Sequence, residues 1–266
     1  KVLQKIEPEN TVNDLIGQME VEIEKDRNSA VGWRYLMQPW LRTPLMIAVC
    51  IMFFQQFVGI NTVIYYSPKI FLMAGFESTL SAIWASVGIG IVNVVFTVIS
   101  LYLVDRIGRR KLYFIGLSGI AFSVLCLSAC FIYANQLGEI GRWLMVIFMF
   151  GYVAFFAISI GPLGWLVISE IFPQKVRGLG TSIGSLAVWI FNCIVSFTFF
   201  KIIDFFSIPG TEIVVGQTTS ENPAGAFFLY GFIAVLGLVW GYLFLPETKG
   251  LSLEEIEQKW RKNREC

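Results

Sequence analysis

Six long stretches of the chain contain no Asp, Glu, Lys or Arg, and they constrain the fold more than any other feature of the sequence. They cover 43–68, 78–104, 112–138, 143–169, 178–200 and 222–246. Each is longer than the roughly 20 apolar residues that an α-helix needs to cross a bilayer. None alternates in polarity for long, as the strands of a membrane β-barrel do. We therefore predict an all-α membrane protein with a bundle of six transmembrane helices over 43–246.

The positive charges orient these helices. If the chain begins in the cytoplasm, four segments lie on that side: 1–42, 105–111, 170–177 and 247–266. They hold 17 of the 20 Lys and Arg residues, and the opposite side keeps only Lys69, Arg142 and Lys201. Because cytoplasmic loops of membrane proteins carry an excess of Lys and Arg, we expect both termini in the cytoplasm. We expect the protein to lie in a plasma or inner membrane.

The first 38 residues have a different composition. Leu15, Met19 and Ile23 recur every four residues on an otherwise charged stretch, which predicts an amphipathic cytoplasmic helix over 14–25. This helix either lies on the membrane surface or braces the cytoplasmic helix ends. We thus divide the chain into a cytoplasmic loop segment with this helix (1–42), the transmembrane bundle (43–246) and a cytoplasmic tail (247–266).

The residue types exclude several classes of function. The chain has no His, which removes His-ligated metal sites and Ser–His dyads. The net charge of +1 gives no case for nucleic-acid binding. The five Cys residues form no CxxC pair, so we interpret those within the apolar stretches as buried apolar side chains. We expect no catalytic residue, no cofactor, no metal and no nucleic-acid partner.

Polar residues gather at the middle of the first apolar stretch. Gln55, Gln56 and Asn61 lie close to Gly59, which predicts a helix that loosens halfway and offers unpaired backbone groups. Carriers hold their solutes at such broken helices near the bilayer midplane. The alternative is that the amides only tie neighbouring helices together. Three amides at one level favour a solute site.

Two other stretches carry a polar or small face. In the second stretch it consists of Ser86, Gly90, Asn93, Thr97 and Ser100. In the fifth it consists of Gly178, Ser182, Ser185, Trp189, Asn192 and Ser196. The pairs Gly180–Gly184 and Gly237–Gly241 are interpreted as helix-packing contacts. The fourth stretch is interrupted at Gly161-Pro162-Leu-Gly164-Trp165, where proline removes a helical hydrogen bond.

Amides and tryptophans without charges suit a neutral polyhydroxylated ring. Asn and Gln each offer a donor and an acceptor to hydroxyl groups. Indole offers a flat apolar surface to the C–H faces of the ring. An ion pathway needs carboxylates or stacked carbonyls instead, and the six stretches contain no carboxylate.

Five motifs occur in chain order. They are QQFVGIN at 55–61 followed by Tyr65 and Tyr66, DRIGRR at 105–110, GPLGW at 161–165, SEIFP at 169–173 running to Arg177 and Gly178, and PETKG at 246–250. In these motifs the chain resembles the sugar porter family of the major facilitator superfamily, which includes facilitative glucose transporters and proton-coupled xylose symporters. The resemblance covers the whole chain and corresponds to the C-terminal six-helix half of a twelve-helix carrier.

The resemblance implies transport of a neutral monosaccharide, a hexose or a pentose, by alternating access, with this half supplying most of the sugar contacts. The expected partners are the sugar, the lipid bilayer, and either the N-terminal six-helix half of the same carrier or a second six-helix chain. The implied sugar-binding residues are Gln55, Gln56, Asn61, Asn93, Trp165, Trp189 and Asn192. The implied gating residues are Tyr65, Tyr66, Gly161 and Pro162.

The chain departs from the family at two of these levels. Ala157 stands where animal glucose carriers have Glu, and Val188 stands where the family commonly has Asn or Gln. Each missing hydrogen bond is worth about 1 kcal/mol, which allows a preference for a sugar other than glucose.

Charged residues at the predicted cytoplasmic helix ends form a second group: Asp105, Arg106, Arg109, Arg110, Glu170, Arg177 and Glu247. Topology alone explains them as solvated ion pairs, each worth under about 1 kcal/mol. The resemblance implies instead a salt-bridge network that holds the cytoplasmic ends together while the carrier is open to the outside.

Other functions stay open at this stage. One is a proton-coupled symporter of a polyol or a cyclitol such as inositol, and another is a six-helix channel or scaffold module. An intramembrane serine protease is disfavoured because its usual base, His, is absent.

Overall fold

The computed structural model describes residues 33–76, 78–207, 213–215, 218–250, 255–256 and 260. The predicted amphipathic helix over 14–25 lies outside the described residues. The described chain begins with the short helix α2 (Trp33–Leu36) and the 3-10 turn η2 (Pro39–Leu41).

The described residues contain six helical segments that are long and apolar enough to cross a membrane. They are Pro39–Met73, Thr79–Ile107, Arg109–Ile132, Ala134–Ile171, Gln174–Phe205 and Ala224–Phe244. The prediction of a six-helix membrane protein is therefore confirmed.

Two of the six segments are discontinuous. The first consists of α3 (Arg42–Phe57) and α4 (Ile60–Met73), and the fourth consists of α7 (Ala134–Ile158) and α8 (Ile160–Ile171). The others are α5 (Thr79–Ile107), α6 (Arg109–Ile132), α9 (Arg177–Phe205, after the 3-10 turn η3, Gln174–Val176) and α10 (Ala224–Phe244).

A small antiparallel hairpin joins α9 to α10, and the sequence did not predict it. Strand β1 (Ile213–Val215) pairs with β2 (Thr218–Ser220), with Ile213 opposite Ser220.

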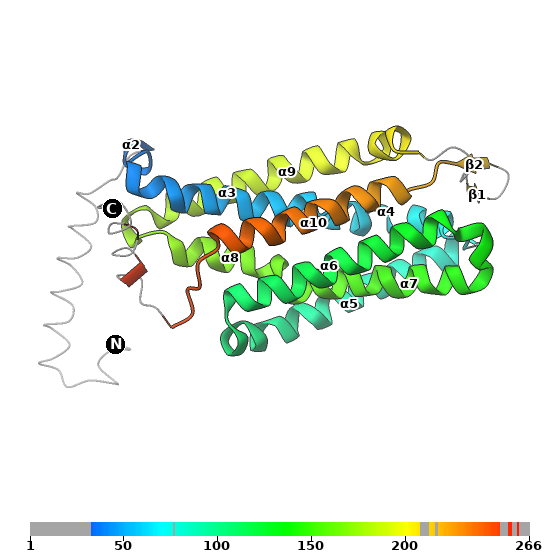
Figure 1. The fold of residues 1–266 in the computed structure, drawn as a ribbon, viewed down its shortest axis with the longest axis horizontal. Coiled ribbons are helices and arrows are strands. Elements are labelled where there is room, and N and C mark those ends of the chain that lie inside the picture. Colours follow the sequence, from blue (N-terminus) through cyan, green and yellow to red (C-terminus); the bar gives the residue numbers. More distant parts are fainter. Residues whose placement is uncertain are drawn as a thin grey trace, which may run out of the picture.

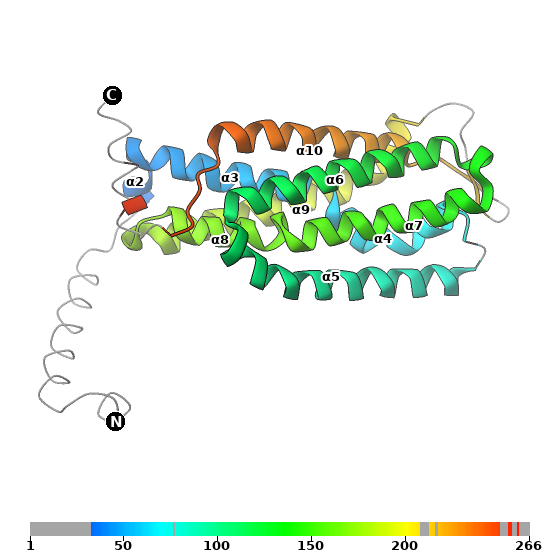
Figure 2. The same cartoon turned by 60° about the horizontal axis from the view of Figure 1, so that its bottom comes forward.

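The helices run back and forth along one bundle (Figure 1). The start of α3, the α5–α6 turn, the α8–α9 connection and the end of α10 lie at the left end of the view. The end of α4, the α6–α7 turn and the hairpin lie at the right end. The chain thus places its positively charged connections at one end. Figure 2 shows α5 at the edge of the bundle, on the side opposite α10.

Glycines let α10 pack closely on α6. The Tyr113 hydroxyl of α6 donates a hydrogen bond to the Gly237 carbonyl of α10 at 2.9 Å. A Cβ atom on Gly241 would lie 2.4 Å from Cε1 of Tyr113, which no real contact allows. Gly180 and Gly184 similarly face Phe172 and Ile168. The prediction that both glycine pairs serve helix packing is confirmed.

We predict that Gly241→Leu lowers the stability of the purified chain by about 1–3 kcal/mol, because the added side chain overpacks the contact with Tyr113. Thermal unfolding in detergent measures this change. Gly90→Ala is the matched control, since open space surrounds Gly90, and it should not lower the unfolding temperature. An equal loss in both variants would contradict the packing role of Gly241.

Candidate solute-binding site

The break between α3 and α4 depends on Gly59. Its backbone has φ +86°, a left-handed conformation that costs most residues about 1–2 kcal/mol. A Cβ atom here would also lie 2.2 Å from the ring of Tyr230 on α10. Only glycine therefore fits both the backbone angle and the close approach of Tyr230, and the prediction that the first helix loosens halfway is confirmed.

The break does not leave its backbone unpaired at Val58, contrary to expectation. The Thr62 N–H donates to the Gly59 carbonyl at 3.1 Å and not to Val58, four residues before it. The Val58 carbonyl instead accepts a hydrogen bond from the Tyr152 hydroxyl of α7 at 2.7 Å. A buried side chain from another helix thus satisfies the group that the break releases.

The break between α7 and α8 lies at Ser159, just before the predicted Gly161–Trp165 interruption. Ser159 has the non-helical angles φ −127° and ψ −102°. Pro162 has no N–H to donate to the Ile158 carbonyl, so the hydrogen-bond ladder of α7 does not continue across it. Pro162 lies in the first turn of α8, where a missing N–H is tolerated.

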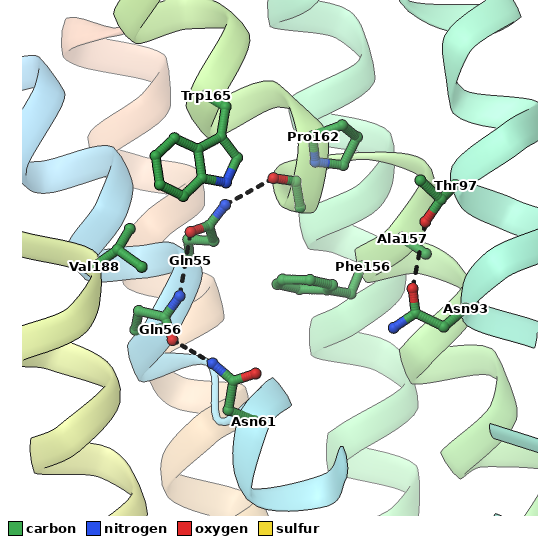
Figure 3. Close-up of a pocket in the computed structure, with 11 residues that line it drawn as sticks. Gln55, Gln56, Asn61, Asn93, Thr97, Phe156, Ala157, Pro162, Trp165 and Val188 are labelled. Atoms are coloured by element: carbon green, nitrogen blue, oxygen red, sulfur yellow. Dashed lines mark hydrogen bonds between the residues drawn. The ribbon is translucent and has the colours of Figure 1, made fainter. Parts of the chain in front are cut away.

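Three amide side chains connect the two breaks (Figure 3). Asn61 Nδ2 donates to Gln56 Oε1 at 2.5 Å, and Gln56 Nε2 donates to Gln55 Oε1 at 3.2 Å. Gln55 Nε2 then donates to the carbonyl oxygens of Ile160 and Gly161 at 3.1 and 2.7 Å. Gln55 and Gln56 are nearly fully buried, which gives this chain of hydrogen bonds a fixed position.

These amides line a cavity of about 340 Å³. Its lining consists of Gln55, Gln56, Asn61, Asn93, Thr97, Phe156, Ala157, Gly161, Pro162, Trp165 and Val188. In Figure 3 the three amides lie on one side of Phe156, and Asn93 and Thr97 of α5 lie on the other. The volume is in the range of small-molecule sites. None of these lining residues is charged, so the cavity suits a neutral ligand.

The structure brings five of the seven predicted sugar-binding residues to this cavity: Gln55, Gln56, Asn61, Asn93 and Trp165. Trp189 and Asn192 of α9 do not line it. Trp189 is 67% exposed, and Asn192 Nδ2 donates to the Tyr65 hydroxyl at 3.4 Å. Successive residues of a helix point about 100° apart. Val188 therefore lines the cavity, whereas its neighbour Trp189 does not. Sugar binding by all seven stays a prediction.

Four lining residues were not among the predicted binding and gating residues: Thr97, Phe156, Ala157 and Val188, of which the last two were named only as departures from the family. Thr97 follows Asn93 by one helical turn, and its hydroxyl donates to Asn93 Oδ1 at 3.3 Å. The polar face of the second stretch was the signal for it. Phe156 gave no signal, because an apolar residue within an apolar stretch is indistinguishable from its neighbours in the sequence.

The predicted gating residues of α4 contact α9. The ring of Tyr66 stacks on Phe199 with centroids 5.5 Å apart, and its hydroxyl donates to the Ser196 carbonyl at 3.4 Å. Lys69 Nζ lies 4.0 Å above the ring of Phe200. These contacts hold α4 against α9 beyond the break at Gly59.

Arg109 is the centre of the charged group at the other end of the bundle. Its guanidinium pairs with Glu170 of α8 at 2.8 Å and with Asp105 at 3.3 Å. The other carboxylate oxygen of Glu170 accepts a hydrogen bond from Thr248, which the sequence did not indicate. This cluster ties the α5–α6 turn to the end of α8.

Glu247 caps a helix at this end. Its carboxylate accepts from the backbone N–H groups of Arg109 and Arg110 at 3.0 and 3.2 Å, at the start of α6. A carboxylate at a helix N-terminus is favoured by the helix dipole. Gly108, which precedes α6, has no Cβ atom to obstruct this carboxylate.

The remaining members of the predicted network have other surroundings. Arg106 contributes its backbone carbonyl, which accepts from Lys249 Nζ at 2.7 Å. Arg110 Nη2 donates to the Tyr242 carbonyl at 2.7 Å. Within the described part of the chain, Nε and Nη2 of Arg177 are buried without a hydrogen-bond partner.

The sequence matches the family described as "Sugar (and other) transporter" over residues 1–260. The chain belongs to this family. It is 38% identical to the glucose transporter GlcP of Staphylococcus epidermidis, over 86% of this chain and 47% of that protein. It is 35% identical to the D-xylose-proton symporter of Escherichia coli K12, over 91% of this chain and 46% of that protein.

A solved structure of the proton:xylose symporter XylE bound to 6-bromo-6-deoxy-D-glucose has the same fold, with a TM-score of 0.71 and 33% identity over 93% of this chain and 49% of that one. The chain thus spans about half the length of these relatives. The predicted membership of the sugar porters and of the major facilitator superfamily is confirmed. Membership of a family of transporters also agrees with the prediction that the chain is not an enzyme.

The described residues contain no group of three or more His, Cys, Asp or Glu that could hold a metal ion.

We predict that Gly59→Ala destabilises the chain by more than the ~1–2 kcal/mol expected for a left-handed backbone alone, because the new methyl group also collides with Tyr230. Unfolding in detergent measures the loss. Gly75→Ala is the control: its φ is +93°, but a Cβ atom there would approach only Arg142 Nε at 3.5 Å. Equal losses at the two positions would show that the Tyr230 contact has no role in the break.

Proposed function

We propose that this chain is half of a membrane carrier that moves a neutral monosaccharide, a hexose or a pentose, by alternating access. The observation that carries the proposal is the uncharged, amide-lined cavity between two broken helices. Carriers place their substrate sites at such breaks because irregular backbone in a membrane is tolerated only where it lines a cavity or is buried in protein.

The lining of the cavity supports a sugar as the substrate. Beyond the hydrogen bonds of the amide chain, Gln56 and Asn61 each keep donor and acceptor capacity. This combination suits the hydroxyl groups of a sugar. Trp165 offers an indole face to the C–H side of a ring. The names of the relatives point the same way, since GlcP is a glucose transporter and the structure of XylE contains a bromodeoxyglucose.

Ala157 and Val188 make part of this cavity apolar. Both line it, and the resemblance to the sugar porters implies that a hydrogen-bonding side chain commonly stands at these two positions. Ala157 and Val188 lie on opposite sides of the cavity (Figure 3). The loss of about 1 kcal/mol per hydrogen bond favours a substrate that lacks a hydroxyl group next to one or both of these side chains. The preferred sugar is therefore expected to differ from glucose.

The proposed partner is a second six-helix half that covers α5 and α9. In an apolar stretch of 18 residues, only 11% of α5 is buried, whereas 67% of such a stretch is buried in the first membrane segment. Gly90 faces open space on the same side of α5 as Asn93. The relatives are about twice as long as the matched region, which agrees with a missing half. In such a carrier Trp189 and Asn192 would face the other half.

We place the charged end of the bundle in the cytoplasm. The Lys and Arg excess of its connections supports this orientation. The Arg109–Glu170 pair and its neighbours would then close the cytoplasmic side while the cavity is open to the outside. Both side chains are mostly shielded from water, which makes the pair stronger than an exposed one.

Uptake by the complete carrier in proteoliposomes tests the proposal. We expect saturable uptake of a radiolabelled hexose or pentose, and counterflow when unlabelled sugar is loaded inside. A channel gives neither saturation at low concentration nor counterflow, so passive linear flux would overturn the proposal.

We predict that Gln56→Leu abolishes sugar binding to the carrier, because it removes the donor and the acceptor at the centre of the amide chain. Titration calorimetry measures the affinity. Phe228→Leu is the control, since Phe228 lies exposed on α10 outside the cavity, and its affinity should be unchanged. Retained affinity in Gln56→Leu would refute the assignment of the site.

We predict that Glu170→Gln shifts the carrier toward its inward-open state, because the ion pair with Arg109 is lost. Labelling of a Thr97→Cys carrier by an impermeant thiol reagent from outside should fall, with Cys193 replaced by Ser. Asp105→Asn is the control, because the Asp105 side chain is 76% exposed and its ion pair is weak. Unchanged labelling in Glu170→Gln would contradict the closure role.

A further inference from the structure

Gln55 differs from the other cavity amides in where its hydrogen-bond donors point. Its Nε2 contacts two backbone carbonyl oxygens, those of Ile160 and Gly161 in the first turn of α8. A carbonyl oxygen only accepts hydrogen bonds, so the NH₂ end of Gln55 must face α8. Both of its amide hydrogens are then used within the protein.

The orientation of Gln55 fixes the direction of the whole amide chain. With its NH₂ group turned to α8, Gln55 presents Oε1 to Gln56, which must donate to it. Gln56 in turn presents Oε1 to Asn61, which must donate. The chain therefore runs from the first turn of α4 to the first turn of α8, and it joins the two helix breaks through side chains.

A glycine allows α8 to come this close. A Cβ atom on Gly164 would lie 2.9 Å from Gln55 Nε2 and 3.3 Å from Met52 Sδ. Any larger residue at this position would push the Gln55 amide away from the two carbonyls. The close approach of α3 and α8 at this level therefore depends on Gly164, which leaves room for the Gln55 amide.

We propose that Gln55 is a positioning residue, which ties the substrate-facing amides of Gln56 and Asn61 to the first turn of α8, so that this turn and the solute site move together. The proposal rests on the proposed function as a carrier. Towards the solute, Gln55 keeps only an acceptor lone pair on Oε1. Its main contribution is then to link the occupied site to α8, and not to supply affinity.

Hydrogen exchange of the complete carrier without sugar tests this link. In Gln55→Met, which keeps the length of the side chain, amide exchange over 160–167 should rise about fivefold or more, because one hydrogen bond is worth a factor of about this size. Gln56→Met is the matched control: it keeps both Gln55–α8 contacts, and exchange over 160–167 should stay unchanged. Exchange over 113–124 of α6 should change in neither variant.

Counterflow kinetics add a second measurement that a purely structural role would not separate. Gln55→Met should lower the maximal rate with little change of KM, whereas Gln56→Met, like Gln56→Leu, should show no saturable counterflow. If Gln55→Met fails to fold, Gly164→Ala decides, since it displaces the Gln55 amide without removing it, and exchange over 160–167 should rise in it as well.

Three results would overturn the proposal. They are unchanged exchange over 160–167 in the folded variants, an equal rise in Gln56→Met, or a change of KM alone in Gln55→Met. Because exchange is measured without sugar, a failure of the carrier function would appear separately, as absent uptake by the unmodified protein.

Discussion

The pairing of backbone groups at the two helix breaks is the constraint on which the rest of this structure depends. In the hydrocarbon region water cannot satisfy a free carbonyl, so a broken helix needs side chains that do so. Tyr152 of α7 pairs the Val58 carbonyl at the first break. Next to the second break, Gln55 of α3 donates to two carbonyls in the first turn of α8. Each broken helix thus supplies a side chain that bonds the backbone of the other at or next to its break.

This reciprocal arrangement also defines the cavity. The breaks bring the amides of the first segment and the first turn of α8 to the same level, with Trp165 beside them. The unbroken helices α5 and α9 complete the lining with Asn93, Thr97 and Val188. Away from the breaks, glycine contacts such as that of Gly241 with Tyr113 hold the outer helices α6 and α10 together.

Much of the fold was predictable from the sequence for a simple reason. Charges are excluded from the membrane, so their absence over six stretches predicts the spans without knowledge of any contact. The β1–β2 hairpin was not predicted, because it lies in a connection where the membrane imposes no pattern. The break at Gly59 was indicated by local residues, whereas the exact position of the second break depends on Ser159, which has no sequence signal of its own.

For the candidate site, the sequence by itself determined the chemistry: uncharged amides and an indole at the level of a broken helix, and a charged group at the helix ends. Only the tertiary structure decided which of these side chains meet. It placed Val188 and not Trp189 at the cavity, gave Glu247 the role of a helix cap, and turned both donors of Gln55 toward α8. The physical reason is that residue types and their spacing reflect the membrane and the local helix, whereas contacts between residues about a hundred positions apart, such as Gln55 and Gly161, depend on how the helices pack.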